Sequence, residues 1–283
     1  MPAVLEIIKK TTDFLSGRGV ESPRLNAEHL IGHALDLKRM ALYLQFERTL
    51  TEAELEKIRV VVRRRALREP LQHILGETDF FGLKLKTDRR ALIPRPETEL
   101  LVELVTQIVP TPPATVLDLG TGGGAIALAL ARHWPAAHVT AVDASDVALA
   151  LARENTAALG LSERVTLLCS DWCSALPADA RYDLVVSNPP YLSAAETAAT
   201  APEVRDFDPA AAHTAAEDGL ADLRHIITEK PSRLNAGGLL ALETGITQHA
   251  ILKRLADESG FVRVESRPDL TGRDRFIFAW RPV

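Results

Sequence analysis

The sequence is poor in cysteine and in long apolar runs. Cys169 and Cys173 are its only thiols, and with no His or third Cys at a zinc-ligand spacing they predict neither a disulfide framework nor a metal site. No apolar stretch reaches the roughly 18 residues that a membrane helix needs. Residues 1–10 also lack the cationic start and apolar core of a signal peptide. We therefore expect no membrane association and a cytoplasmic location.

The acidic residues are concentrated in the C-terminal two thirds of the chain. The net charge of the 283 residues is −5, with 46% hydrophobic and 25% charged residues, which is typical of a folded globular protein. Residues 1–90 carry 17 Lys and Arg against 13 Asp and Glu, whereas residues 91–283 carry 16 against 25. A domain with such an acidic excess repels a phosphate backbone, so we expect no nucleic acid as a direct substrate.

The spacing of apolar residues predicts two domains with a connector between them. Helical spacing over residues 1–75 predicts a small helical domain. Alternating apolar residues and the prolines of Ile93-Pro94-Arg95-Pro96 predict a hairpin and a stiff linker over residues 76–96. From residue 97 to 283, strands alternate with helices, which predicts a doubly wound, mostly parallel, Rossmann-like sheet that binds ligands at the carboxyl ends of its strands. The alanine-rich stretch Ser193–Ala216 fits no element and is expected to be a long loop over the site.

A glycine-rich turn joins the first predicted strand, Val116–Leu119, to the following helix. Its residues are Gly120, Thr121, Gly122, Gly123 and Gly124. Glycine lets backbone amides approach a ligand closely, and Asp143, which closes the next strand, can accept hydrogen bonds from ribose hydroxyls. The turn also satisfies the dinucleotide pattern G-x-G-x-x-A, so NAD stays open. Asp118, just before the turn, favours the cationic S-adenosylmethionine (AdoMet) over a pyrophosphate.

The tetrad Asn188-Pro189-Pro190-Tyr191 ends the predicted strand Leu184–Ser187. On a doubly wound sheet this strand lies beside the first strand, so the tetrad faces the glycine turn. Its two prolines remove backbone donors and leave outward carbonyl acceptors. The Asn188 side-chain oxygen and the Pro189 carbonyl could therefore hold both hydrogens of a planar NH2 group, with the flat face of Tyr191 against it. Holding both hydrogens would aim the nitrogen lone pair at a methyl donor.

Taken together, these motifs make the sequence resemble the release-factor glutamine methyltransferase family (PrmC/HemK) over nearly its whole length. The motifs that carry the resemblance are Pro70-Leu71-Gln72 with Ile74-Leu75-Gly76, Ile93-Pro94-Arg95-Pro96-Glu97-Thr98-Glu99, Asp118-Leu119-Gly120-Thr121-Gly122, Ser170-Asp171-Trp172, Ser187-Asn188-Pro189-Pro190-Tyr191 and Glu217-Asp218-Gly219-Leu220. Many amine methyltransferases share the tetrad, including enzymes that act on adenine in DNA. The junction at 93–99 is far more specific, because related ribosomal-protein glutamine methyltransferases lack its Pro-Glu-Thr-Glu continuation.

The resemblance implies a class I AdoMet-dependent methyltransferase domain with a seven-stranded sheet. It also implies methyl transfer to the glutamine of the Gly-Gly-Gln motif in bacterial class-1 peptide release factors. By the same resemblance, the family's cofactor site implies that Gly120–Gly124 cradle the methionine part of AdoMet and that Asp143 holds its ribose. It also implies that Asp171 and Trp172 contact adenine. Asn188–Tyr191 grip the glutamine amide, and the helical domain of a monomeric enzyme helps to dock the release factor. Arg95 is expected to bridge the domains or to lie near the substrate loop, although a solvated linker arginine is the alternative.

Rival functions remain open from the residues alone. A nucleic-acid amine methyltransferase, or a glutamine methyltransferase of ribosomal protein, could use the same tetrad. An NAD-dependent oxidoreductase could use the glycine turn, and a non-catalytic module could bind AdoMet without transferring its methyl group. Glu243, at the end of a later strand, is either a residue that tunes the site or an ordinary surface acid. Gly123 and His73 depart from residues common in the family, but neither touches the tetrad.

Overall fold

The computed structural model describes the backbone of residues 1–283, and the side chains of all of them except residues 229–231. The chain forms two compact units. The first comprises Met1–Glu77 together with Ala201–Phe207, and the second comprises Thr78–Thr200 together with Asp208–Val283. Most of the segment 76–96 therefore lies in the second unit, whereas residues 201–207 leave that unit and return to it.

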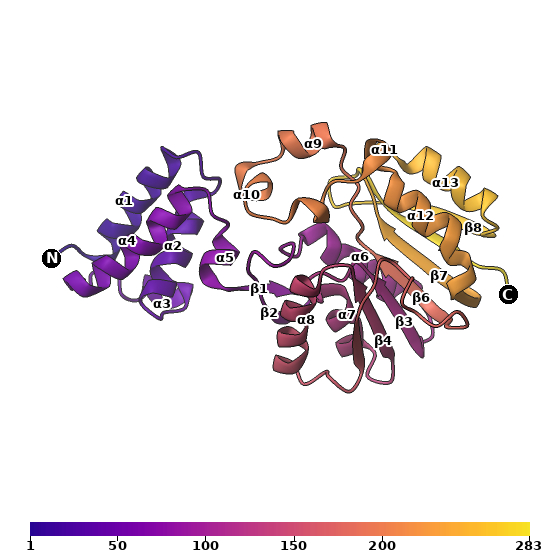
Figure 1. Cartoon of the computed structure of the whole chain (residues 1–283). Helices are drawn as coiled ribbons and strands as arrows, with labels where there is room; N and C mark the ends of the chain where they lie inside the picture. Colours follow the sequence, from indigo (N-terminus) through magenta and orange to yellow (C-terminus); the bar gives the residue numbers. More distant parts are fainter. The chain divides into compact units, whose positions relative to one another are not determined.

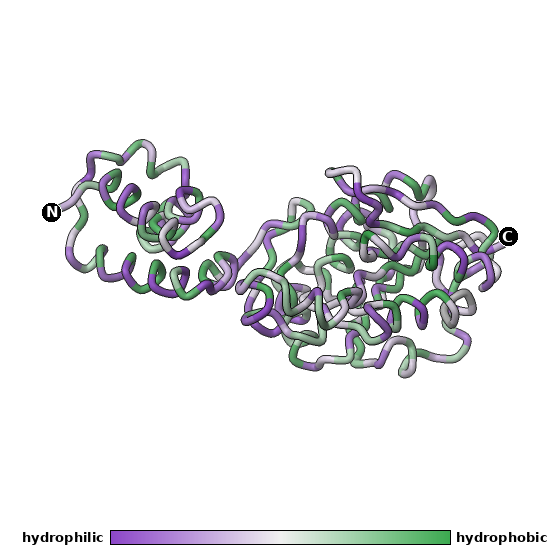
Figure 2. Tube along the Cα trace, turned by 90° about the horizontal axis from the view of Figure 1, so that it is seen from above, coloured by the Kyte–Doolittle hydropathy of each residue, from purple (hydrophilic) through white to green (hydrophobic). Residues whose placement is uncertain are grey.

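The first unit is helical. Its elements are α1 (Val4–Ser16), α2 (Pro23–Ala34), α3 (Arg39–Tyr43), α4 (Glu52–Ala66), α5 (Leu71–Leu75) and, from the later segment, α10 (Pro202–Arg205). Hydrophobic and hydrophilic residues alternate along the helices (Figure 2), and their apolar sides meet in a core that includes Ile8, Leu30 and Ile58. Glu203 of α10 forms ion pairs with both Arg65 (2.8 Å) and Arg68 (2.7 Å). These two pairs hold the later segment in this unit.

The second unit contains a seven-stranded sheet and a two-stranded hairpin, which confirms the predicted fold class (Figure 1). The hairpin strands are β1 (Glu77–Phe80) and β2 (Leu83–Lys86). The sheet strands are β3 (Thr115–Leu119), β4 (His138–Asp143), β5 (Val165–Cys169), β6 (Tyr182–Ser187), β7 (Leu234–Glu243), β8 (Arg263–Pro268) and β9 (Asp274–Trp280). Their order is β5-β4-β3-β6-β7-β9-β8, and only β9 runs antiparallel to its neighbours. The order reverses direction at β3, which is where a doubly wound sheet binds its ligand.

Helices cover both faces of this sheet and create two cores. One face packs on α6 (Pro96–Ile108), α7 (Ala125–His133) and the hairpin. The other face packs on α12 (Ala221–Glu229), which continues into η2 (Lys230–Arg233), and on α13 (His249–Glu258). α8 (Asp146–Ala158) follows β4. The central strands β3 and β6 are almost fully buried because both of their faces are covered.

Three sequence-based expectations about local structure need correction. The stretch Ser193–Ala216 is not a structureless loop but contains α9 (Ala194–Ala199), α10, η1 (Ala210–Ala212) and the first residue of α11 (Ala216–Gly219). A capping box between Ser193 and Glu196 starts α9, and alanine is the best helix former. The apolar run Leu100–Val109 predicts a helix that begins at Leu100, but α6 begins four residues earlier because Pro96 suits the first helical turn. The alternation over Phe80–Lys86 predicts an exposed strand, but Leu83 and Leu85 are buried in the core.

Candidate functional site

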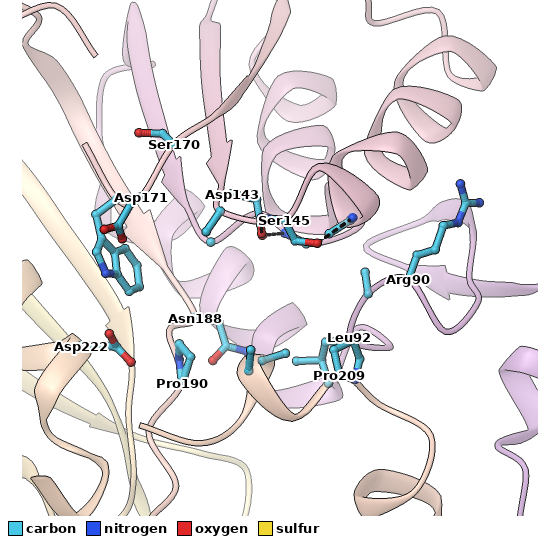
Figure 3. Close-up of a pocket in the computed structure, with 18 residues that line it drawn as sticks. Arg90, Leu92, Asp143, Ser145, Ser170, Asp171, Asn188, Pro190, Pro209 and Asp222 are labelled. Atoms are coloured by element: carbon cyan, nitrogen blue, oxygen red, sulfur yellow. Dashed lines mark hydrogen bonds between the residues drawn. The ribbon is translucent and has the colours of Figure 1, made fainter. Parts of the chain in front are cut away.

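A cavity lies at the carboxyl ends of β3, β4, β5 and β6. Parallel pairing sets Leu119 of β3 beside Val142 of β4 and Ser187 of β6, so the segments after these strands meet at one edge. They enclose a cavity of about 500 Å³, which Figure 3 shows. Gly120, Gly122, Asp143, Asp171, Trp172, Asn188 and Pro190 line it, as the sequence predicts for a single site. Pro209, Ala211 and Ala212 line it too, so part of the 193–216 stretch also borders the cavity.

Two glycines of the turn beside this cavity, Gly122 and Gly124, have left-handed backbone conformations. Gly122 has a φ of +55°, and its N–H donates to Asp143 Oδ2 at 2.8 Å. Gly124 has a φ of +91°, and a Cβ there would lie 3.1 Å from Leu128 Cδ1. Side chains at these positions would strain the turn or push α7 away from it. Thr121, Gly123 and Gly124 support the turn but do not line the cavity.

Asp143 sits at the rim with its carboxylate fixed by two backbone amides. Its Oδ2 accepts from Gly122 N and its Oδ1 accepts from Ser145 N, both at 2.8 Å. Figure 3 shows Asp143 and Ser145 side by side on the cavity wall. Each carboxylate oxygen keeps a further lone pair. The geometry therefore provides a rigid acceptor for hydroxyl groups of a bound ligand.

Asp118 lies beneath the turn and does not line the cavity. Its Oδ2 accepts from Thr121 Oγ1 at 2.6 Å and from Ala127 N at 3.1 Å, while its buried Oδ1 has no hydrogen-bond partner among the residues whose side chains are described. Burial raises the pKa of Asp118 to about 7, although the two hydrogen bonds oppose the shift. Asp118 thus ties the glycine turn to the first residues of α7 and lies behind the turn rather than on the cavity wall.

The burial of Asp118 predicts that Asp118→Asn changes the pH dependence of stability. Because the folded protein holds this proton more tightly than the unfolded chain, the wild-type free energy of unfolding should fall as pH rises from about 4 through about 7. Asparagine keeps the acceptor and cannot ionise. Urea unfolding at pH 5 and pH 8 should therefore show the variant gaining, relative to wild type, on the order of 1 to a few kcal/mol at the higher pH. A difference between the two proteins that is the same at both pH values would contradict an Asp118 that is protonated in the fold.

The far wall of the cavity is acidic. Asp171 and Trp172 follow β5, and Asp222 lies near the start of α12, with Asp171 and Asp222 on the same side of the view in Figure 3. Burial raises the pKa of Asp222, and the Asp171 charge adds to the shift. Sequence reasoning missed Asp222 because its helical spacing marks it only as one residue of an amphipathic helix. An acidic wall suits a cation better than a pyrophosphate.

Arg90 borders the same cavity but offers no charge to it. Figure 3 shows its guanidinium pointing away from the other labelled side chains. Its Nε donates to Asp88 at 2.9 Å and its Nη1 donates to Glu154 at 2.6 Å. Two carboxylates therefore neutralise this cation, and the cavity keeps its acidic character.

Asn188 connects the large cavity with a smaller one of about 40 Å³. Pro189, Tyr191 and Arg95 border the smaller cavity, whereas Pro190 borders the larger one. The Asn188 Nδ2 donates to Thr98 Oγ1 at 2.9 Å. Its Oδ1 accepts from no side chain or backbone group in the described part of the chain. The tetrad therefore presents an acceptor at the boundary between two cavities.

Glu243 and Thr98 form a buried polar cluster behind the tetrad. The Tyr191 hydroxyl donates to Glu243 Oε1 at 2.9 Å, and the Thr98 hydroxyl donates to Glu243 Oε2 at 2.7 Å. Burial raises the pKa values of both Glu243 and Tyr191, and the Arg275 guanidinium, 5.7 Å from the centre of the Tyr191 ring, counteracts both shifts. Glu243 is 1% exposed, so it is not a surface acid. Sequence reasoning assigns no role to the Tyr191 hydroxyl or to Thr98.

Arg95 is held by a buried carboxylate and is not a solvated linker residue. Its Nη2 donates to Asp208 Oδ2 at 2.6 Å, and His213 Nε2 lies 3.3 Å from the same oxygen. The Asp208 side chain is 1% exposed. Arg95 thereby joins the start of α6 to the segment that follows residue 207, beside the smaller cavity.

Where side chains are described, no cluster of His, Cys, Asp and Glu has the geometry to hold a metal ion. Among the described helices, none combines the length and the apolar character that spanning a bilayer requires.

The sheet order, the glycine turn and the acid after β4 define a class I AdoMet-dependent methyltransferase. Solved structures share this fold at low sequence identity. The hMettl16 catalytic domain, solved with an RNA hairpin, superimposes with a TM-score of 0.60 at 20% identity over 78% of this chain and 81% of that one. The Thermus thermophilus 16S rRNA methyltransferase RsmC, solved with AdoMet and guanosine, gives 0.53 at 21% identity over 72% and 49%. At such identities the likeness establishes the fold alone.

Sequence comparison resolves the family. Residues 6–76 match the PrmC N-terminal domain, and residues 96–220 match the methyltransferase small domain. A release factor glutamine methyltransferase of Rhodopirellula baltica is 39% identical, covering 97% of this chain and 95% of that protein. One from Cereibacter sphaeroides is 42% identical, covering 95% of each. The chain belongs to the release factor glutamine methyltransferase family.

Proposed function

We propose that this enzyme transfers a methyl group from AdoMet to the side-chain amide nitrogen of the glutamine in the Gly-Gly-Gln motif of a bacterial class-1 peptide release factor. The observation that carries this proposal is the position of Asn188 at the junction of two cavities, where its Oδ1 accepts no hydrogen bond from the described residues. Relatives named release factor glutamine methyltransferase match this chain over nearly its full length. The larger cavity accommodates the methyl donor and the smaller one admits a side-chain amide.

The residues of the larger cavity fit AdoMet. Its volume of about 500 Å³ lies within the range usual for small-molecule sites. The Gly120–Gly124 turn would lie against the methionine part, Asp143 would accept from the ribose hydroxyls, and Asp171 with Trp172 would contact adenine. The acidic wall of Asp171 and Asp222 favours this cationic molecule over NAD, whose pyrophosphate it would repel. When bound, AdoMet supplies an electrophilic methyl group.

The tetrad solves the problem of a weak nucleophile by orientation. The lone pair of an amide nitrogen is delocalised into its carbonyl, so the nitrogen attacks poorly unless it is held and polarised. Asn188 Oδ1 and the Pro189 carbonyl accept the two amide hydrogens, and the Tyr191 ring supports the planar group from one side. Preorganised acceptors of this kind lower the activation barrier because they fix the geometry of the amide and stabilise the positive charge that develops on its nitrogen.

The two units divide the work of recognition and chemistry. The helical domain of residues 1–75 docks the release factor, residues 76–96 supply the hairpin and linker, and residues 97–283 carry the chemistry. An excess of basic residues over residues 1–90 suits an acidic protein surface. The acidic excess of residues 91–283 opposes a nucleic acid as substrate. The enzyme acts as a monomer in the cytoplasm.

Labelled AdoMet tests this function directly. The protein is incubated separately with a release factor, with ribosomal protein, with DNA and with RNA, and label transfer is measured for each. We expect label on the release factor alone, and none on a release factor whose Gly-Gly-Gln glutamine is replaced by glutamate. Label confined to a nucleic acid or to ribosomal protein would reject the proposed substrate, and calorimetric binding of NAD instead of AdoMet would reject the proposed class of reaction.

A further inference from the structure

The orientation of the Asn188 amide is decided by residues that do not face the cavity. An asparagine amide has an acceptor end and a donor end of nearly equal shape, and only the acceptor end can hold an NH2 group. Nothing in the tetrad itself selects between them. The donor end, Nδ2, contacts Thr98 Oγ1 at 2.9 Å, and Thr98 in turn contacts Glu243 Oε2 at 2.7 Å.

When Glu243 is ionised, proton counting along the chain Glu243–Thr98–Asn188 leaves one arrangement. An ionised carboxylate only accepts hydrogen bonds, so both groups that contact Glu243 must donate to it: Tyr191 to Oε1 and Thr98 to Oε2. Thr98 has a single hydroxyl proton and has then spent it. Its oxygen can only accept from Asn188, which must present Nδ2 to Thr98 and Oδ1 to the cavity. Thr98 is 5% exposed and Glu243 is 1% exposed, so water is largely excluded as a substitute partner.

We propose that Glu243 and Thr98 are positioning residues that fix the side-chain amide of Asn188 with its oxygen toward the substrate and thereby make the site specific for an NH2 group. This inference rests on the proposed role of Asn188 in holding the glutamine amide. Glu243 acts through Thr98 and Tyr191, and touches neither substrate nor cofactor. Its Oε1 also accepts from the Tyr191 hydroxyl and so holds the Tyr191 ring. One carboxylate thereby orients both polar side chains of the tetrad.

We call the hydrogen-bond chain from Glu243 through Thr98 to Asn188 the relay. Three variants test it, and the rate of methyl transfer to the release factor is the readout. Thr98→Val keeps the shape of the side chain but removes the hydroxyl, and we expect kcat to fall about 10- to 100-fold, as for loss of one buried hydrogen bond at the site. Thr98→Ser keeps the hydroxyl and should restore kcat to near the wild-type value. Glu243→Gln introduces an NH2 donor that permits the Asn188 amide to flip, and it should lower kcat by a similar factor. Thr106→Val, a more exposed position on the same helix, is the control and should change nothing.

Further readouts separate positioning from a structural role. Affinity for AdoMet, measured by calorimetry, and the free energy of unfolding of Thr98→Val and Thr98→Ser should differ far less than their kcat values do. The double variant Thr98→Val, Glu243→Gln should be no slower than the worse single variant, because both break one chain of hydrogen bonds. A Thr98→Val enzyme as fast as wild type, or a Thr98→Ser enzyme as slow as Thr98→Val, would overturn the relay.

A measurement without substrate keeps the relay distinct from the proposed function. The Nδ2 resonance of Asn188, assigned by its loss in Asn188→Ala, should shift in Thr98→Val and return in Thr98→Ser whichever protein the enzyme methylates. An unchanged resonance in Thr98→Val would overturn the relay alone. Full activity of Asn188→Ala on the release factor would reject the role of Asn188, and the relay with it.

Discussion

Asn188→Ala is expected to lower kcat for methyl transfer by about 10²- to 10³-fold, the cost of removing one preorganised polar group from a reacting centre. The substitution deletes the acceptor for one amide hydrogen and leaves only the Pro189 carbonyl. The amide of the substrate then loses its orientation, and its nitrogen lone pair is no longer directed. Single-turnover transfer of labelled methyl to the release factor measures the effect.

The same variant should bind AdoMet within a few-fold of the wild-type affinity. Asn188 is one of several polar residues that line the large cavity, and Asp143, Asp171 and Asp222 line it as well. Calorimetry on the variant therefore separates two roles of Asn188. A loss of affinity that matches the loss of rate would make Asn188 chiefly a ligand of the cofactor, and a wild-type rate would remove it from the mechanism.

Those parts of the site that follow strands could be predicted from the sequence, because local patterns fix strand ends and parallel pairing brings them together. This applies to the glycine turn after β3, to Asp143 after β4 and to the tetrad after β6. The burial of Asp118 was within reach of the same reasoning. Side chains alternate along a strand, and Asp118 shares its face of β3 with Val116, which packs in the core beneath α7.

The contacts that cross long sequence separations could not be predicted. Thr98 lies 145 residues from Glu243 and 90 residues from Asn188. No periodicity records which helix position will meet which strand end, because that depends on how α6 packs on β7. The return of residues 201–207 to the first unit has the same origin, since it depends on Glu203 meeting Arg65 and Arg68 across more than a hundred residues.

A left-handed turn holds the backbone of the tetrad from the other side. Glu217, Asp218 and Gly219 all have positive φ angles, of 52°, 54° and 86°. The Gln248 amide donates from Nε2 to Tyr191 O at 3.0 Å and to Gly219 O at 3.1 Å, and so joins the turn to the end of the tetrad. The left-handed backbone is strained at the two non-glycine residues, Glu217 and Asp218, unless neighbouring contacts hold them. The motif Glu217-Asp218-Gly219-Leu220 thus supports the site without lining it.

Gly219→Ala is therefore expected to lower both stability and activity. A Cβ at Gly219 would lie inside van der Waals contact of the Tyr191 carbonyl oxygen and 2.9 Å from Gln248 Nε2. The left-handed φ costs alanine about 1 kcal/mol and the overlap adds 1–3 kcal/mol, so the free energy of unfolding should fall by roughly 2–4 kcal/mol. Urea unfolding measures this loss. Methyl transfer by the folded fraction should also fall, because relief of the overlap displaces Tyr191 from Glu243.

Gly260→Ala is the matched control that isolates the close approach. Gly260 has nearly the same φ, +87°, but a Cβ there meets nothing within 4 Å. It should lose only about 1 kcal/mol, the conformational part of the penalty, and keep its full rate of methyl transfer. Equal losses of stability at the two positions would mean that the tetrad backbone moves freely away from Gly219. The support we assign to the left-handed turn would then be absent, and the orientation of Tyr191 would depend on Glu243 alone.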